Sequence, residues 1–116
     1  MSDSLYIPRG DTARVCVHVV DSDGESIDLS AFALTFRLLR SMQDDVSAAI
    51  FVGTDSGGEI SFLDVKDGIA EVAIPGSASA VLMIGRPYPW TMTLTNSGNS
   101  FTPVSGLLYA TIPSKA

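Results

Sequence analysis

Cys16 and His18, the only cysteine and the only histidine of the chain, carry its most reactive side chains. A cysteine nucleophile needs a base within hydrogen-bond reach. The two residues stand two positions apart in an alternating stretch typical of a strand, where residues i and i+2 are separated by roughly 6.5 to 7 Å. Proton transfer requires about 3 Å. We therefore interpret both as residues of the less apolar strand face, where they can meet a partner chain.

Asp21, Asp23 and Glu25 place alternate carboxylates around Gly24, a pattern that resembles part of a calcium loop. A calcium ion takes six to eight oxygen ligands, and this stretch lacks the remaining spaced ligands and the late bidentate glutamate. The pattern favours an ordinary polar turn. We expect no bound metal and no cofactor.

Two further carboxylate pairs, Asp44 with Asp45 and Asp64 with Asp67, lie in segments rich in turn formers. Acid and base catalysis by two carboxylates needs environments that separate their pKa values. Nothing beside these residues predicts a buried pocket, so we expect solvated loops and no enzyme.

Arg9, Gly10 and Asp11 spell a tripeptide that integrins bind, but three residues coincide by chance too often to be diagnostic. The glycine and the aspartate suit a turn. We predict that they turn the chain from a first edge strand into a long second strand.

The composition indicates one soluble domain without a nucleic-acid or membrane partner. The 116 residues, 46% of them hydrophobic and 17% charged, suffice for one core. A net charge of −6 without a basic stripe argues against binding to nucleic acid. A single cysteine allows no internal disulfide. Neither a signal peptide nor a membrane span is evident, which indicates a protein made in the cytoplasm.

Hydrophobic alternation and turn-forming clusters predict an all-β fold. From residue 12 to 20, Ala13, Val15, Val17 and Val19 alternate with more polar residues. We predict strands at 12–20, 32–38, 49–52, 59–63, 69–74, 89–95 and 107–112, with turns between them that include 102–106. One or two helical turns at 77–84 should cross between the sheets. Seven or eight short strands at this spacing are typical of a sandwich or a small barrel.

The larger residues of the alternating inward faces should share one core, and the ends of the chain should be loosely held. The expected core members are Val15, Val17, Phe36, Trp90 and Leu94. Residues 1–116 are expected to form a single domain with loose tails at 1–5 and 114–116.

The ordered set of motifs resembles the immunoglobulin-like domain at the N-terminus of phage baseplate upper proteins, which recurs in phage and prophage tail proteins. The resemblance spans nearly the whole chain. It rests on IPRGDT at 7–12, DGESIDLS at 23–30 leading to Phe36 and Arg37, DGIAEV at 67–72, the small-residue segment through Leu82, YPWTMTL at 88–94 and GLLY at 106–109.

This resemblance implies an immunoglobulin-like β-sandwich of seven to eight short antiparallel strands, with no catalytic residues. It also implies a virion structural protein, a docking module of the tail or baseplate that contacts other virion proteins and copies of itself. A capsid decoration or head-attached protein is the alternative. Domains of this family usually head longer fibre proteins, so a chain that runs from Met1 to Ala116 favours a stand-alone component.

A rival from another class is a carbohydrate-binding module in which Tyr88, Trp90 and Tyr109 line a sugar-facing surface. An exposed, coplanar Trp and Tyr pair would support it, and a buried Trp90 would oppose it. We expect Trp90 in the core and Tyr88 near the rim.

Partner contacts are expected at unpaired strand edges, which a partner can extend by adding a strand. Prolines at 8 and 113 indicate that the first and last strands are the edges. The expected partner-binding residues are Leu5, Tyr6, Ile7, Leu107 and Tyr109, with Met42, Asp44 and Asp45 in a second site at 42–47. Deleting residues 1–7 should spare the fold but weaken incorporation into the virion.

Overall fold

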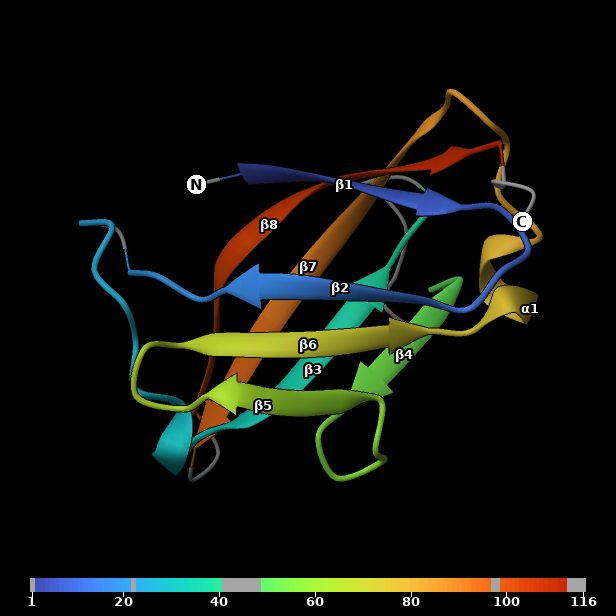
Figure 1. The fold of residues 1–116 in the computed structure, drawn as a ribbon. Coiled ribbons are helices and arrows are strands. Elements are labelled where there is room, and N and C mark those ends of the chain that lie inside the picture. Colours follow the sequence, from blue (N-terminus) through green and yellow to red (C-terminus); the bar gives the residue numbers. More distant parts are fainter. Residues whose placement is uncertain (1, 22, 41–48, 97–98, 113–116) are drawn as a thin grey trace.

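The computed structural model describes residues 2–21, 23–40, 49–96 and 99–112. They form two facing β-sheets, one of five strands and one of three (Figure 1). The larger sheet has the order β1 (Ser2–Pro8), β8 (Asn99–Thr111), β7 (Pro87–Asn96), β3 (Ala33–Leu38), β4 (Phe51–Thr54). The smaller has the order β2 (Ala13–His18), β6 (Ile69–Ile74), β5 (Ile60–Asp64). A 3-10 turn, η1 (Leu29–Ala31), and one helical turn, α1 (Gly76–Ser79), complete the elements.

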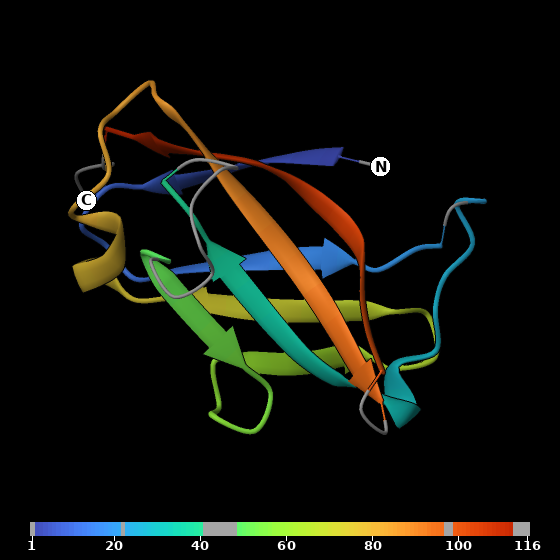
Figure 2. The ribbon, with the colours of Figure 1, turned by 180° about the vertical axis from the view of Figure 1, so that it is seen from behind.

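The order of the strands is that of an immunoglobulin-like sandwich, as predicted. Strands β2, β6 and β5 correspond to strands B, E and D of that fold, and they face β8, β7, β3 and β4, which correspond to G, F, C and C′. Neighbouring strands are antiparallel except β1, which runs parallel to β8 over seven residue pairs. Figure 2 shows the larger sheet from its outer side.

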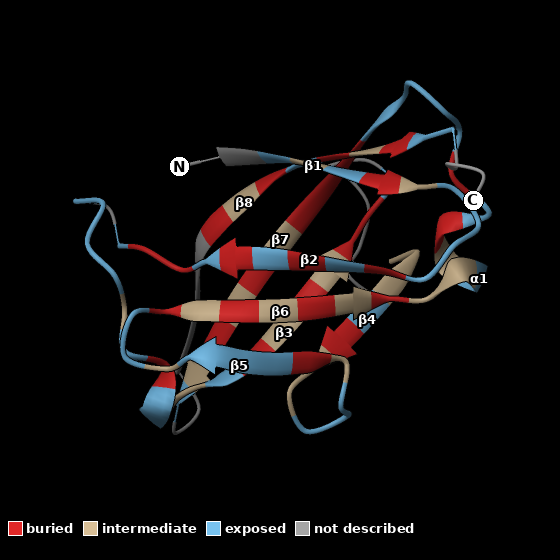
Figure 3. Cartoon of the chain, in the orientation of Figure 1, coloured by how far each residue is buried: buried red, intermediate tan, exposed pale blue. Residues whose placement is uncertain are grey.

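The inner faces of both sheets form one core, and the five residues expected there belong to it. Burial alternates along β2, β3 and β6, so each strand has one buried side (Figure 3). The rings of Phe36 on β3 and Trp90 on β7 stack with centroids 5.7 Å apart and planes 22° from parallel. This aromatic pair fills the centre of the sandwich without a disulfide.

Tyr88 is buried in the core, so the prediction that it reaches the rim is wrong. Its hydroxyl accepts a hydrogen bond of 2.7 Å from the backbone N–H of Met83, five residues upstream. A tyrosine near the start of strand F that bonds to upstream backbone is the tyrosine corner of immunoglobulin-like folds. The bond satisfies the buried hydroxyl and fixes the path of the chain into β7.

The turn between β1 and β2 is hydrogen-bonded to the helical turn α1 at one end of the sandwich. Gly10 has a φ of +86°, the left-handed conformation that glycine adopts readily. Its N–H donates to the hydroxyl of Ser79, 2.9 Å away, and that hydroxyl lies 3.2 Å from the carbonyl oxygen of Asp11. The glycine therefore has the turning role predicted for it. The crossing between the sheets is likewise confirmed, with the α-helical part limited to one turn.

Replacing Ser79 with alanine should lower the free energy of unfolding by about 1 to 3 kcal/mol, the usual cost of leaving a buried polar group without its partner. Ser79 is fully buried, and the change would remove the acceptor of the Gly10 N–H. Ser77→Ala on the same turn, where the side chain is exposed, is the control. Denaturant titrations of both variants test this, and equal losses would contradict it.

Three predictions about the chain ends are corrected. Residues 2–5, expected as a loose tail, form the first part of β1. Residues 102–106, expected as a turn, lie inside β8. Strand β8 is an inner strand that pairs with both β1 and β7, so of the two terminal strands only β1 is an edge. The tail expected at 114–116 lies outside the described residues.

Within the described ranges, no helix is long and apolar enough to cross a membrane.

Candidate docking surface

The reactive residues of β2 are exposed and engage other neighbours. The His18 ring nitrogen Nε2 is 2.8 Å from the hydroxyl of Ser26, which orients the imidazole toward the following loop. Cys16 is exposed and lies opposite Glu71 of β6 in the register. Glu71 accepts a hydrogen bond of 3.1 Å from Arg14. The outer face of the smaller sheet is thus polar at β2, as predicted.

The carboxylates at 21–25 build a polar turn. One oxygen of Asp21, Oδ1, accepts the backbone N–H groups of Asp23 and Glu25 at 2.9 and 3.0 Å. Across the residues that the structure describes, no group of three His, Cys, Asp or Glu side chains could hold a metal ion.

Chelation should leave the melting temperature unchanged, because the Asp21 carboxylate is directed to backbone donors of the turn itself. Thermal melts in excess EDTA, with and without added calcium, provide the measurement. A drop of several degrees in EDTA that calcium restores would identify the turn as a binding site.

The other carboxylate pairs do not form an acid and base centre in the described residues. Asp64 accepts the backbone N–H of Asp67 at 3.1 Å, so its carboxylate caps the turn between β5 and β6. Asp44 and Asp45, with Met42, lie outside the described residues.

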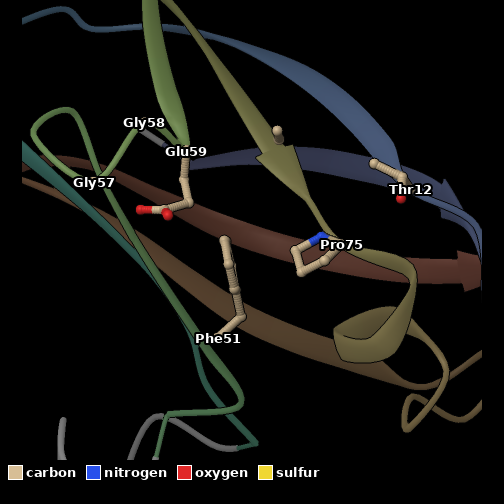
Figure 4. A pocket seen from close by; sticks show the side chains of 7 residues that line it. Thr12, Phe51, Gly57, Gly58, Glu59 and Pro75 are labelled. Carbon is tan, nitrogen blue, oxygen red and sulfur yellow. The ribbon is translucent and has the colours of Figure 1, made fainter.

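An open pocket of about 370 Å³ lies between the start of β4 and the end of β6 (Figure 4). Of its lining residues, only Glu59 ionises, and its Oε1 accepts the backbone N–H of Thr54 at 3.0 Å. The other lining residues are Thr12, Phe51, Gly57, Gly58, Ala73 and Pro75. A catalytic pocket needs several converging polar groups. This one brings together apolar side chains, glycines, one threonine and one carboxylate that already accepts a backbone hydrogen bond.

The outer side of the larger sheet carries an exposed aromatic and apolar patch, which we name the Tyr6 face and define as Tyr6, Pro87, Leu107 and Tyr109. Tyr6 of β1 lies opposite Tyr109 of β8, and Tyr109 lies opposite Pro87 of β7. The two tyrosine rings stack with centroids 5.4 Å apart and planes 15° from parallel. Tyr6 is 65% exposed and Leu107 is 38% exposed. The patch therefore crosses three adjacent strands at the β1 edge.

The rest of this outer face is mainly polar, and its exposed apolar residue on β4 is Val52. Its described strand positions include Thr35, Thr54, Thr91 and Thr93, which the register places side by side. Arg37 lies among them, 3.5 Å from the Thr93 hydroxyl. β3 and β4 present hydroxyl groups and one guanidinium beside the exposed Val52, so the aromatic part of this face lies on the β1 side of the sheet.

A second exposed apolar group, the apolar end, lies where β8 finishes and is defined as Val81, Met83, Ile84 and Ile112. Ile84 forms a parallel bridge with Ala110, which holds the segment before β7 against β8. Six of the nine exposed large hydrophobic side chains in the described ranges belong to the Tyr6 face or the apolar end. Exposed apolar surface thus gathers around β1, β8 and the approach to β7.

The residues expected to bind a partner divide into three groups. Tyr6 and Leu107 are exposed, and Leu5 and Tyr109 are partly exposed. Ile7 is a correction, because it is 1% exposed and belongs to the core, where it cannot meet a partner. Three of the expected residues lie outside the described residues: Met42, Asp44 and Asp45. The prediction from sequence did not include Pro87 or the apolar end. The apolar residues at 81–84 could have indicated the apolar end, but the prediction used them only as part of the helical turns that cross between the sheets.

The surface expected for a carbohydrate-binding module does not form. Trp90 is fully buried and Tyr88 is 3% exposed. Tyr109 stacks its ring against Tyr6, so these two rings cover one another instead of lying side by side in one plane.

The fold and these surfaces define an immunoglobulin-like β-sandwich on which most of the exposed large apolar side chains of the described residues lie around β1, β8 and the approach to β7. Comparison with known proteins finds no family model that matches the chain and no curated protein that matches its sequence.

Proposed function

We propose that this chain is a non-enzymatic structural protein of a phage or prophage virion, a docking module of the tail or baseplate. The observation that carries the docking role is the Tyr6 face, an exposed aromatic and apolar patch on a rigid sheet. The resemblance of the ordered motifs to the immunoglobulin-like domain of baseplate proteins supports the virion assignment.

The composition of the Tyr6 face supports docking to protein. Tyrosine is enriched at interfaces and at the few positions that supply most of the binding energy. Stacking holds the two tyrosines in one arrangement, so less side-chain entropy is lost on binding. The surrounding threonines and Arg37 supply a polar rim, which is the usual anatomy of a specific interface.

The virion assignment is tested on purified particles of the phage, or induced prophage, that encodes the chain. Particles are separated into heads and tails and analysed by quantitative mass spectrometry. We expect the chain in the tail fraction in several copies per particle. Recovery with the heads would support the alternative of a capsid decoration protein, and absence from both fractions would overturn the proposal.

The docking surface is tested by complementing a deletion phage with variants of the chain. Leu107→Asp places a charge on the Tyr6 face, and we expect its copy number in particles to fall by about tenfold or more, as for a loss of at least 1.4 kcal/mol of binding. Leu63→Asp on the smaller sheet, where the leucine is also exposed, is the matched control and should be incorporated normally. Equal incorporation of both variants would show that the Tyr6 face is not the docking surface.

A further inference from the structure

Strand β1 is an open edge of the larger sheet. It pairs with β8 along one side over residues 2–8, and no described strand pairs with its other side. Its register with β8 is continuous, without a bulge, and the chain extends it through a hydrogen bond of 3.0 Å from the Arg9 N–H to the Thr111 carbonyl oxygen. Half of the backbone groups of such a strand therefore remain available for another strand.

The other edges of the sandwich are shorter, irregular or charged. β4 has four residues and contains Gly53, and β5 is interrupted by a register shift between Phe62 and Asp64. β2 carries the ion pair of Arg14 and the exposed His18. Such features discourage pairing at an edge. β1 is regular over residues 2–7 and has its proline only at the last position, so it is the least protected of the described edges.

Tyr6 stands at the centre of the residues exposed along this edge, with Tyr109 stacked on the side facing β8. A strand added to β1 would bring its own side chain against the opposite side of the Tyr6 ring, since directly opposite residues have Cβ atoms about 4.5 to 5.5 Å apart. Aromatic cross-strand pairs are among the favourable ones. The edge is thus suited to a partner strand with a tyrosine at that position, and β1 itself is such a strand.

We propose that two copies of this chain pair antiparallel through β1, with Tyr6 of one copy opposite Tyr6 of the other. The pairing is two-fold symmetric, so each copy offers the same surface. It would join the two larger sheets into one continuous sheet and place a row of four tyrosines, Tyr109 and Tyr6 from each copy, along its outer side.

In an antiparallel pair centred on residue 6, Ser4 of one strand stands opposite Pro8 of the other, so the pair spans residues 4–8 and brings no like charges together. Arg9 lies in the turn after β1, where its Nε donates to the Leu82 carbonyl oxygen at 2.8 Å.

This inference deepens the proposed docking role by naming a second copy as one partner, and it is tested on the purified chain without any virion. Sedimentation velocity from about 10 µM to about 1 mM, concentrations at which weak complexes associate, should show a monomer and dimer equilibrium. Tyr6→Lys should weaken the dimer by about tenfold or more, and Tyr6→Phe should retain it. Hydrogen exchange of the intact chain should slow within residues 4–7 as concentration rises.

Two matched variants decide where the contact lies. Val52→Lys introduces the same charge at an exposed residue of β4, the other edge of the same sheet, and should leave the dimer unchanged. Leu107→Asp, which tests virion docking, should also leave it unchanged. Three outcomes would each overturn the inference. The chain could stay monomeric at about 1 mM, Tyr6→Lys and Val52→Lys could weaken the dimer equally, or the slowed hydrogen exchange could lie outside β1. A monomer found in virions would refute the β1 pairing alone, and a dimer absent from virions would refute the virion role alone.

Discussion

Replacing Phe36 with alanine is expected to lower the free energy of unfolding by about 3 to 5 kcal/mol, the usual range for a buried aromatic residue. The ring has no exposed surface and stacks on Trp90, with Phe51 on another side at a centroid distance of 6.3 Å. Strand β3 lies between β4 and β7, so the cavity would open in the interior of the sheet, where neighbours on both sides limit collapse.

The measurement is a denaturant titration of the intact chain and two variants. Phe62→Ala is the matched control, because this ring lies on the edge strand β5 and is 38% exposed. Its loss should be smaller than that of Phe36→Ala by about 2 kcal/mol or more, since less area returns to water and no closed cavity forms. A loss below about 1 kcal/mol for Phe36→Ala would contradict the central place of this ring.

The strands that face solvent on one side were predictable because their side chains alternate. In β2 the valines at 15 and 17 point inward while Arg14 and Cys16 point outward, and the burial follows that pattern residue by residue. β6 begins and ends where predicted, at Ile69 and Ile74. The two-residue alternation of side chains does not depend on which strands are neighbours. It therefore identifies these strands without knowledge of the topology.

The length of β8 was not predictable from local propensity. Residues 102–106 include Pro103, Ser105 and Gly106, which individually favour turns. Pairing with the ten-residue β7 overrides that preference. Gly106 lies opposite Trp90 in the register, and a glycine inside a strand often marks a position where another group approaches closely. Only the folded sheet shows that this glycine belongs to a strand.

The candidate docking residues were partly predictable for the same reason. Tyr6 and Ile7 are adjacent, and a strand sends adjacent side chains to opposite faces, so both could not reach one partner surface. The sequence alone does not state which of them points inward. The parallel pairing with β8 decides it, because Ile7 lies opposite the buried Ala110 while Tyr6 lies opposite Tyr109.

Gly68→Ala should be the most damaging of the glycine substitutions at the turns, with an expected loss of about 2 to 5 kcal/mol. Gly68 has a φ of +71°, and a side chain in this left-handed conformation costs roughly 1 to 2 kcal/mol. An added Cβ would also lie 2.6 Å from the Val19 carbonyl oxygen and 2.7 Å from that of Ile27. Both are backbone atoms that cannot rotate away, so overpacking adds about 1 to 3 kcal/mol.

These contacts join the turn after β5 to the segment after β2, so the damage should spread to the hydrogen bonds between them. Val19 donates its N–H to the Gly68 carbonyl oxygen at 2.7 Å, and its own carbonyl oxygen accepts the Ile27 N–H at 3.0 Å. The control variant is Gly10→Ala. Gly10 has a similar φ of +86°, but no atom lies within 4 Å of an added Cβ, so this variant isolates the cost of the backbone conformation. It should lose only the conformational part, about 1 to 2 kcal/mol. Denaturant titration compares the two variants, and hydrogen exchange at Val19 and Ile27 should accelerate in Gly68→Ala alone. Equal losses of stability in both variants would mean that the close approach at Gly68 contributes nothing beyond backbone conformation.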